Sequence, residues 1–118
     1  MPVRVAVSLG DPSGIGPEVT ARAVAALRGR GAPILFGDAS FARLARAAGL
    51  ALPEVAPGDP LPPGPVLVRV TRLAAGDRRP GVPSPAGGAA SLAYLEAAFD
   101  ALAGGRAGAL CTAPLAKS

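Results

Sequence analysis

Short runs of alternating or wholly apolar residues predict the strands of this chain. Residues 3–9 alternate and are rich in β-branched side chains, so they predict a first strand. Residues 33–36, 66–70 and 109–112 are shorter apolar runs that predict three more. The segments between these runs are long enough to hold helices or extended loops.

Apolar residues at helical spacing predict three helices between the strands. The first begins at Pro17 and Glu18, because proline needs no N–H in a first turn and an acid there favours the helix dipole. The second is capped by Asp38 or Ser40 and closed by Gly49. The apolar positions of the three helices are, in order, Val19, Ala23, Ala26 and Leu27; Phe41, Leu44, Ala45 and Ala48; and Leu92, Leu95, Phe99 and Leu102.

Two segments have the composition of loops. Residues 53–65 contain six prolines, which exclude a helix or a central strand and predict an exposed, stiff loop. Residues 76–90 are rich in glycine, proline and arginine and predict a second long loop, after which the third helix follows.

The order of these elements predicts an α/β fold, a largely parallel sheet with flanking helices. A parallel sheet needs helices on both faces. Only six residues follow the last predicted strand, at the point where the next covering helix would begin. We therefore expect a truncated unit.

Composition excludes several kinds of site. The chain has no histidine and a single cysteine, Cys111, in an apolar run, so neither an internal disulfide nor a cysteine or histidine metal cluster is available. The net charge of +4 comes from scattered arginines with few aromatic residues, which favours a solvated surface over a nucleic-acid-binding face. No run is long enough to span a membrane and no signal sequence begins the chain, so we expect a cytoplasmic protein that binds neither membrane nor nucleic acid.

A glycine-rich segment joins the first strand to the first helix. Residues 10–16 hold three glycines, whose backbone N–H groups could approach an anion at the positive end of the helix dipole. The Gly-Lys-Ser/Thr ending of a P-loop is absent, and Val19 stands where a dinucleotide fingerprint needs its third glycine. A tight turn and a binding site at the carboxyl end of a strand remain as two open interpretations.

The segment after the last strand has a similar position. Residues 112–117 follow the carboxyl end of a strand, so parallel strands would place them on the same sheet edge as residues 10–16. Lys117 is the only lysine, and its compact charge suits a phosphate or carboxylate. An ordinary exposed lysine is the alternative.

Residues 8–18, Ser-Leu-Gly-Asp-Pro-Ser-Gly-Ile-Gly-Pro-Glu, resemble the opening signature of the 4-hydroxythreonine-4-phosphate dehydrogenase family, G-[DE]-P-[AS]-G-I-G-P-[DE]. The resemblance continues in register through residues 37–38, 48–50, 81–84 and 93–98, and ends at residues 111–117, close to the family's T-[AG]-P-x-x-K. It extends over the whole chain.

The resemblance implies an isocitrate/isopropylmalate dehydrogenase-like fold and a homodimer with active sites between domains. It implies oxidation of 4-phosphooxy-L-threonine by NAD, assisted by a divalent metal (zinc, magnesium or cobalt), and loss of CO₂ to give 3-amino-2-oxopropyl phosphate in vitamin B6 synthesis. Residues 1–118 would be the N-terminal α/β part of this larger two-domain enzyme. The matching residues expected to bind the phosphorylated substrate are Asp11, Ser13, Gly14, Gly16, Thr112 and Lys117.

The family's metal histidines and its main phosphate-binding cations lie beyond Ser118. We therefore assign no catalytic and no metal-binding residue here, and expect the chain alone to hold no cofactor and to be inactive. A different interpretation is a stand-alone, truncated α/β module that binds a small anion or a protein partner without catalysis. A nucleic-acid-binding domain is disfavoured by the scattered arginines.

Overall fold

The computed structural model describes residues 4–10, 16–26, 31–74, 76 and 85–112. Within these ranges the elements are β1 (Val5–Ser8), α1 (Gly16–Ala26), β2 (Ile34–Asp38), α2 (Phe41–Ala47), β3 (Glu54–Val55), β4 (Val66–Thr71), α3 (Pro85–Ala103) and β5 (Ala109–Thr112). The four predicted strands and three predicted helices are all present, and the short strand β3 is additional.

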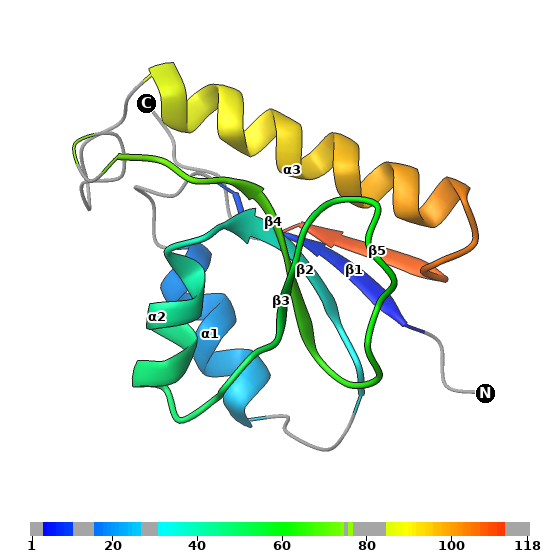
Figure 1. The fold of residues 1–118 in the computed structure, drawn as a ribbon, viewed down its shortest axis with the longest axis horizontal. Coiled ribbons are helices and arrows are strands. Elements are labelled where there is room, and N and C mark those ends of the chain that lie inside the picture. Colours follow the sequence, from blue (N-terminus) through cyan, green and yellow to red (C-terminus); the bar gives the residue numbers. More distant parts are fainter. Residues whose placement is uncertain (1–3, 11–15, 27–30, 75, 77–84, 113–118) are drawn as a thin grey trace.

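The strands form one five-stranded sheet among the described residues, in the order β3-β4-β2-β1-β5. Every neighbouring pair is parallel. In Figure 1, α3 lies on one face of the sheet while α1 and α2 lie together on the other. The predicted α/β class with a largely parallel sheet and flanking helices is therefore confirmed.

The core has two layers because successive strand residues point to opposite faces of the sheet. On β2, Ile34 and Phe36 pack in the layer beneath α3, whereas Leu35 packs in the layer beneath α1 and α2. The same alternation divides β4. The first residues of these central strands are buried on both faces, which explains the short apolar runs at Ile34–Phe36 and Val66–Val68.

Helix α3 begins earlier than the sequence predicted. It starts at Pro85, so residues 85–90 of the expected loop are helical, while residues 77–84 of that loop lie outside the described part of the chain. Proline suits the first turn of a helix. Gly87 and Ala90 are buried, so packing on the sheet outweighs the weak helix propensity of glycine here.

The predicted apolar sides of α1 and α3 turn outward. Val19 is 47% exposed, and Leu92 and Phe99 are each 58% exposed. The buried positions of these two helices are mostly small residues, with Tyr94 as the large exception. Small side chains allow a helix to approach the sheet closely, and alanine carries too little hydrophobic contrast to reveal that side in a sequence pattern.

The end of the proline-rich segment 53–65, just before β4, is held by Arg4. The Arg4 guanidinium donates hydrogen bonds to the carbonyls of Ala32 (2.9 Å), Pro62 (3.2 Å) and Gly64 (2.7 Å). Strand β3 lies within this segment as an edge strand, so it is consistent with the expectation that no central strand could form there.

Candidate functional site

The glycine-rich segment begins at the carboxyl end of β1, directly beside the end of β5. The two strands are parallel, and Ser8 is paired with Thr112. Gly10 follows with φ = 73°, a left-handed conformation that favours glycine, and α1 begins at Gly16. The first and last candidate segments therefore leave the sheet at the same edge, as parallel pairing requires.

Only part of the predicted substrate site lies within the described residues. Gly16 occupies the first position of α1, and Thr112 the last position of β5. Asp11, Ser13, Gly14 and Lys117 lie outside the described residues. The placement of Gly16 and Thr112 is compatible with one shared cleft, and the grouping of all six residues around a substrate stays a prediction.

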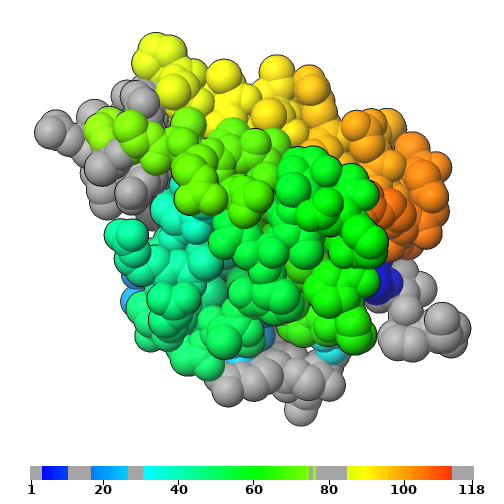
Figure 2. Space-filling view, in the orientation of Figure 1, coloured from blue at the N-terminus to red at the C-terminus, as the bar shows by residue number. Residues whose placement is uncertain are grey.

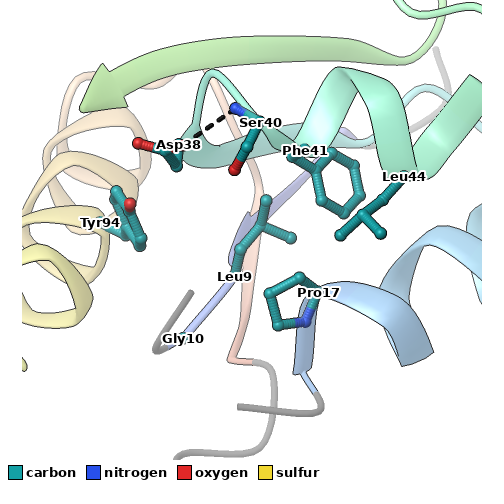
Figure 3. Close-up of a pocket in the computed structure, with 8 residues that line it drawn as sticks. All are labelled: Leu9, Gly10, Pro17, Asp38, Ser40, Phe41, Leu44 and Tyr94. Atoms are coloured by element: carbon teal, nitrogen blue, oxygen red, sulfur yellow. Dashed lines mark hydrogen bonds between the residues drawn. The ribbon is translucent and has the colours of Figure 1, made fainter. Parts of the chain in front are cut away.

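A small hollow opens at this same edge, between the ends of β1 and β2 and the helices around them. Its volume, counted with the solvent at its mouth, is about 250 Å³. The residues that line it are Leu9, Gly10, Pro17, Asp38, Ser40, Phe41, Leu44 and Tyr94 (Figure 3). Most of this lining is apolar, and its polar side chains are those of Asp38, Ser40 and Tyr94.

Asp38 is a buried acid at this edge, with only 4% of its surface exposed. Its Oδ2 accepts the backbone N–H of Ser40 at 2.9 Å. Its Oδ1 accepts two hydrogen bonds, from the hydroxyl of Thr71 at 2.9 Å and from the backbone N–H of Leu73 at 2.6 Å. The carboxylate therefore joins the end of β2 to the start of α2 and to the segment that follows β4.

Tyr94 of α3 extends this network. Its hydroxyl forms a short hydrogen bond with that of Thr71. Because the single hydroxyl hydrogen of Thr71 points to Asp38, Tyr94 must donate and Thr71 accept. The result is a relay from Tyr94 through Thr71 to Asp38 that ties α3 to the carboxyl edge of the sheet.

The environment of Asp38 favours its charged form. Burial raises the pKa of this carboxyl, but the hydrogen bonds from Ser40, Leu73 and Thr71 act in the opposite direction and prevail. The pKa of Asp38 is therefore lower than its ordinary value. With its oxygens already occupied by protein donors, Asp38 is suited to holding the edge together and poorly suited to abstracting a proton.

The network lies where neighbouring strands send their connections to opposite faces. β2 leads into α2 on one face, whereas β4 leads to α3 on the other, and the two strands are adjacent. Their register also shifts between Gly37 and Asp38, after which Asp38 pairs with Thr71. Such a switch point opens a crevice at the carboxyl edge of an α/β sheet, which is the usual place for a ligand.

The donor set of the described residues does not fit a metal ion. No group of three or more histidine, cysteine, aspartate or glutamate side chains comes together in the described part of the chain, and the sequence has no histidine. Cys111, the single cysteine, is exposed on β5. No helix in the described ranges has both the length and the apolar character to cross a membrane.

The sequence indicates Asp38 only as a possible helix cap. It does not reveal the hydrogen bonds that join Asp38 to Thr71 and Leu73. The Thr71 and Tyr94 partners lie 33 and 56 residues away along the chain, too far for any local pattern to reveal. The available indication was position, since an acid that ends a wholly buried strand must find donors at the sheet edge.

Comparison with curated proteins relates almost the whole chain to one group of enzymes, although no family model matches it. The chain is 41% identical to the 4-hydroxythreonine-4-phosphate dehydrogenase of Methylorubrum extorquens strain PA1. That alignment covers 96% of this chain and 35% of the relative. The chain therefore spans about a third of the length of the curated relatives it matches.

Solved structures give the same result for the fold. A 4-hydroxythreonine-4-phosphate dehydrogenase from Burkholderia phymatum superposes with a TM-score of 0.77 at 24% identity, over 99% of this chain and 38% of that one. A terephthalate 1,2-cis-dihydrodiol dehydrogenase from Burkholderia xenovorans LB400 has a TM-score of 0.69 at 32% identity, over 93% and 33%. At 24% identity, the likeness to the Burkholderia phymatum enzyme shows the fold alone. The likeness to the Burkholderia xenovorans enzyme adds similarity in sequence.

Proposed function

We propose, from the premise that this chain belongs to the 4-hydroxythreonine-4-phosphate dehydrogenase family, that it forms an amino-terminal α/β part of an NAD-dependent enzyme of that activity. The complete enzyme would oxidise 4-phosphooxy-L-threonine with NAD and a divalent metal, and release CO₂ to give 3-amino-2-oxopropyl phosphate. The observation that carries this proposal is the 41% identity over 96% of the chain.

Within that enzyme, the chain's own contribution is one wall of the substrate cleft. Asp11 and Ser13 would orient the substrate by hydrogen bonds, while Gly14 and Gly16 would give it access to backbone N–H groups. Thr112 and Lys117 would complete the wall from the neighbouring strand, with Lys117 supplying positive charge to an anionic substrate. The relay from Tyr94 to Asp38 would keep this edge rigid.

The described residues bring together no set of side chains that would hold the divalent metal of this activity, and the sequence has no histidine, so the metal ligands would come from outside the chain. We propose accordingly that the chain alone has no dehydrogenase activity. Calorimetric titration of the chain with zinc or magnesium is expected to be flat, and no NADH should form from 4-phosphooxy-L-threonine. Micromolar metal binding or turnover by the chain alone would contradict this part of the proposal.

A chimeric enzyme tests the proposed function directly. Residues 1–118 would replace the matching third of the Methylorubrum extorquens relative, and NADH formation would be followed by absorbance. We expect turnover, with a raised KM for the anionic substrate when Lys117 is replaced by alanine. Replacement of Arg43, an exposed cation on α2, is the matched control and should leave KM unchanged. A folded chimera without turnover would contradict the proposal.

A further inference from the structure

Helix α3 presents a row of large apolar side chains to solvent. Leu92 and Phe99 are each 58% exposed and Leu95 is 36% exposed. Their spacing, i, i+3 and i+7, places them along one side of the helix. We refer to these three residues as the α3 outer stripe. Figure 2 shows α3, in yellow to orange, along the upper margin of the molecule.

The opposite side of α3 is already occupied by the sheet. Its buried residues are Gly87, Ala90, Tyr94, Ala98 and Ala101, and the larger of these join the core layer beneath α3. The helix is therefore apolar on two sides. A helix with that distribution is characteristically buried between two layers of a larger fold rather than left at a surface.

The charges beside the stripe constrain what could cover it. Glu96 and Asp100 are the charged residues of α3, both are exposed, and they border a shallow depression together with Leu95 and Phe99. A second copy that laid its own α3 antiparallel on this one would bring acidic side chains of both copies together, which is unfavourable. A partner with apolar and basic side chains is the complementary one.

We propose that the α3 outer stripe is the docking surface for the part of the dehydrogenase fold that lies outside this chain in its relatives. The chain matches only 35% of the curated relative and 38% of the superposed structure, so the family fold holds further polypeptide that must pack somewhere. The free edge of β5 could also pair with a further strand, since among the described residues β5 pairs only with β1. The docking segment presents aliphatic side chains flanked by lysine or arginine.

Co-expression tests this proposal, which rests on the proposed function only for the identity of the partner. The chain would be co-expressed with the tagged remaining two thirds of the Methylorubrum extorquens relative, and its recovery with the tag measured. We expect co-purification, reduced about tenfold or more by Phe99→Glu or Leu92→Glu, because charge in a desolvated contact is costly. Val19→Glu, on the opposite face of the sheet and 47% exposed, is the matched control and should co-purify normally.

The possible outcomes distinguish a failure of the proposed docking surface from a failure of the proposed activity. Both stripe variants should melt at the temperature of the unaltered chain when alone, since the replaced side chains are exposed there. Failure of the unaltered chain to co-purify, or equal recovery of Phe99→Glu, overturns the proposal. If the chain alone forms dimers that Phe99→Glu dissociates, and co-purification is unchanged, then the α3 outer stripe binds a second copy of the chain instead. If co-purification depends on the α3 outer stripe but the chimeric enzyme is inactive, the proposed function is contradicted and the docking surface is still supported.

Discussion

Replacement of Asp38 by asparagine removes the charge at the centre of the carboxyl-edge network while keeping the shape of the side chain. The backbone N–H groups of Ser40 and Leu73 and the hydroxyl of Thr71 donate three hydrogen bonds to the carboxylate, two at Oδ1 and one at Oδ2, and the Ser40 side chain also favours its charged form. An asparagine can keep Oδ1 as an acceptor for Thr71 and Leu73. Its NH₂ group then faces the backbone N–H of Ser40, so two donors oppose each other and that hydrogen bond is lost.

The magnitude follows from these three bonds. A hydrogen bond to a charged group contributes about 1.5–3 kcal/mol and a neutral one about 0.5–1.5 kcal/mol, so the substitution removes one strong bond and weakens two others. Asparagine recovers part of this loss because no charge remains to be desolvated. We expect a net decrease of about 2 kcal/mol in the free energy of unfolding, or about 8 °C in Tm for a domain of this size.

The loss should depend on pH in a defined direction. The pKa of Asp38 is lower in the folded protein than its ordinary value of 3.8, so near that pH the unfolded chain binds more protons. The stability that the charge contributes is therefore complete above the ordinary pKa and disappears as pH falls through the lower, folded pKa. The difference between wild type and Asp38→Asn should be constant from neutral pH to about pH 5 and shrink below about pH 4.

Urea unfolding of both proteins between pH 3 and pH 7 measures this difference, in which the contributions of all other carboxyls cancel. Asp59→Asn is the matched control, because Asp59 is exposed and accepts a single backbone N–H, from Ala56. It should change the free energy of unfolding by about 0.5 kcal/mol or less at every pH. A difference for Asp38→Asn that stays constant down to pH 3, or no difference at all, would refute the reasoning.

Four further substitutions probe other parts of the chain. In Gly37→Ala, the new Cβ would lie 2.2 Å from Cδ1 and 3.1 Å from Cγ of Leu9, which is 1% exposed. Urea unfolding should show a loss of about 1–3 kcal/mol, whereas Gly88→Ala, with open space around it, should gain about 0.5–1 kcal/mol from helix propensity. Arg4→Ala removes three hydrogen bonds to backbone carbonyls and should speed proteolytic cleavage of residues 53–65, and an unchanged cleavage rate would contradict that anchoring role. Gly14→Val in the chimeric enzyme should lower kcat/KM by blocking backbone approach, and normal kinetics would reduce the segment to a well-formed turn.

The strands of this fold could be predicted closely from the sequence because their pattern is local. Residues 109–112 were expected as a strand and form one with the same bounds, and residues 66–70 extend by a single residue at Thr71. Short runs of apolar and β-branched residues suit the pleated, partly buried surface of a strand. The parallel pairing then followed from the alternation of strands and helices rather than from any single residue.

The helix faces could not be predicted in the same way, because two apolar sides compete in one sequence. On α3, leucine and phenylalanine dominate any hydrophobic pattern, yet the sheet is covered by Ala90, Ala98 and Tyr94. The sheet selects the side that fits closely, and the side with the larger apolar residues is left for another contact. The row of three large, exposed apolar residues on α3 therefore indicates a second packing partner for this helix.

The candidate site combines both kinds of information. The glycine-rich segment is a local feature, so the sequence could indicate it, and parallel pairing of β1 with β5 brings its start beside Thr112. The Asp38 network depends on contacts between β2, β4 and α3, which only the assembled sheet creates. The network joins β2, the segment after β4 and α3 beside the hollow that Gly10 helps to line, so it would hold this wall of the proposed cleft in place. Binding of an anionic substrate at this edge would therefore depend on a buried carboxylate that need not touch the substrate.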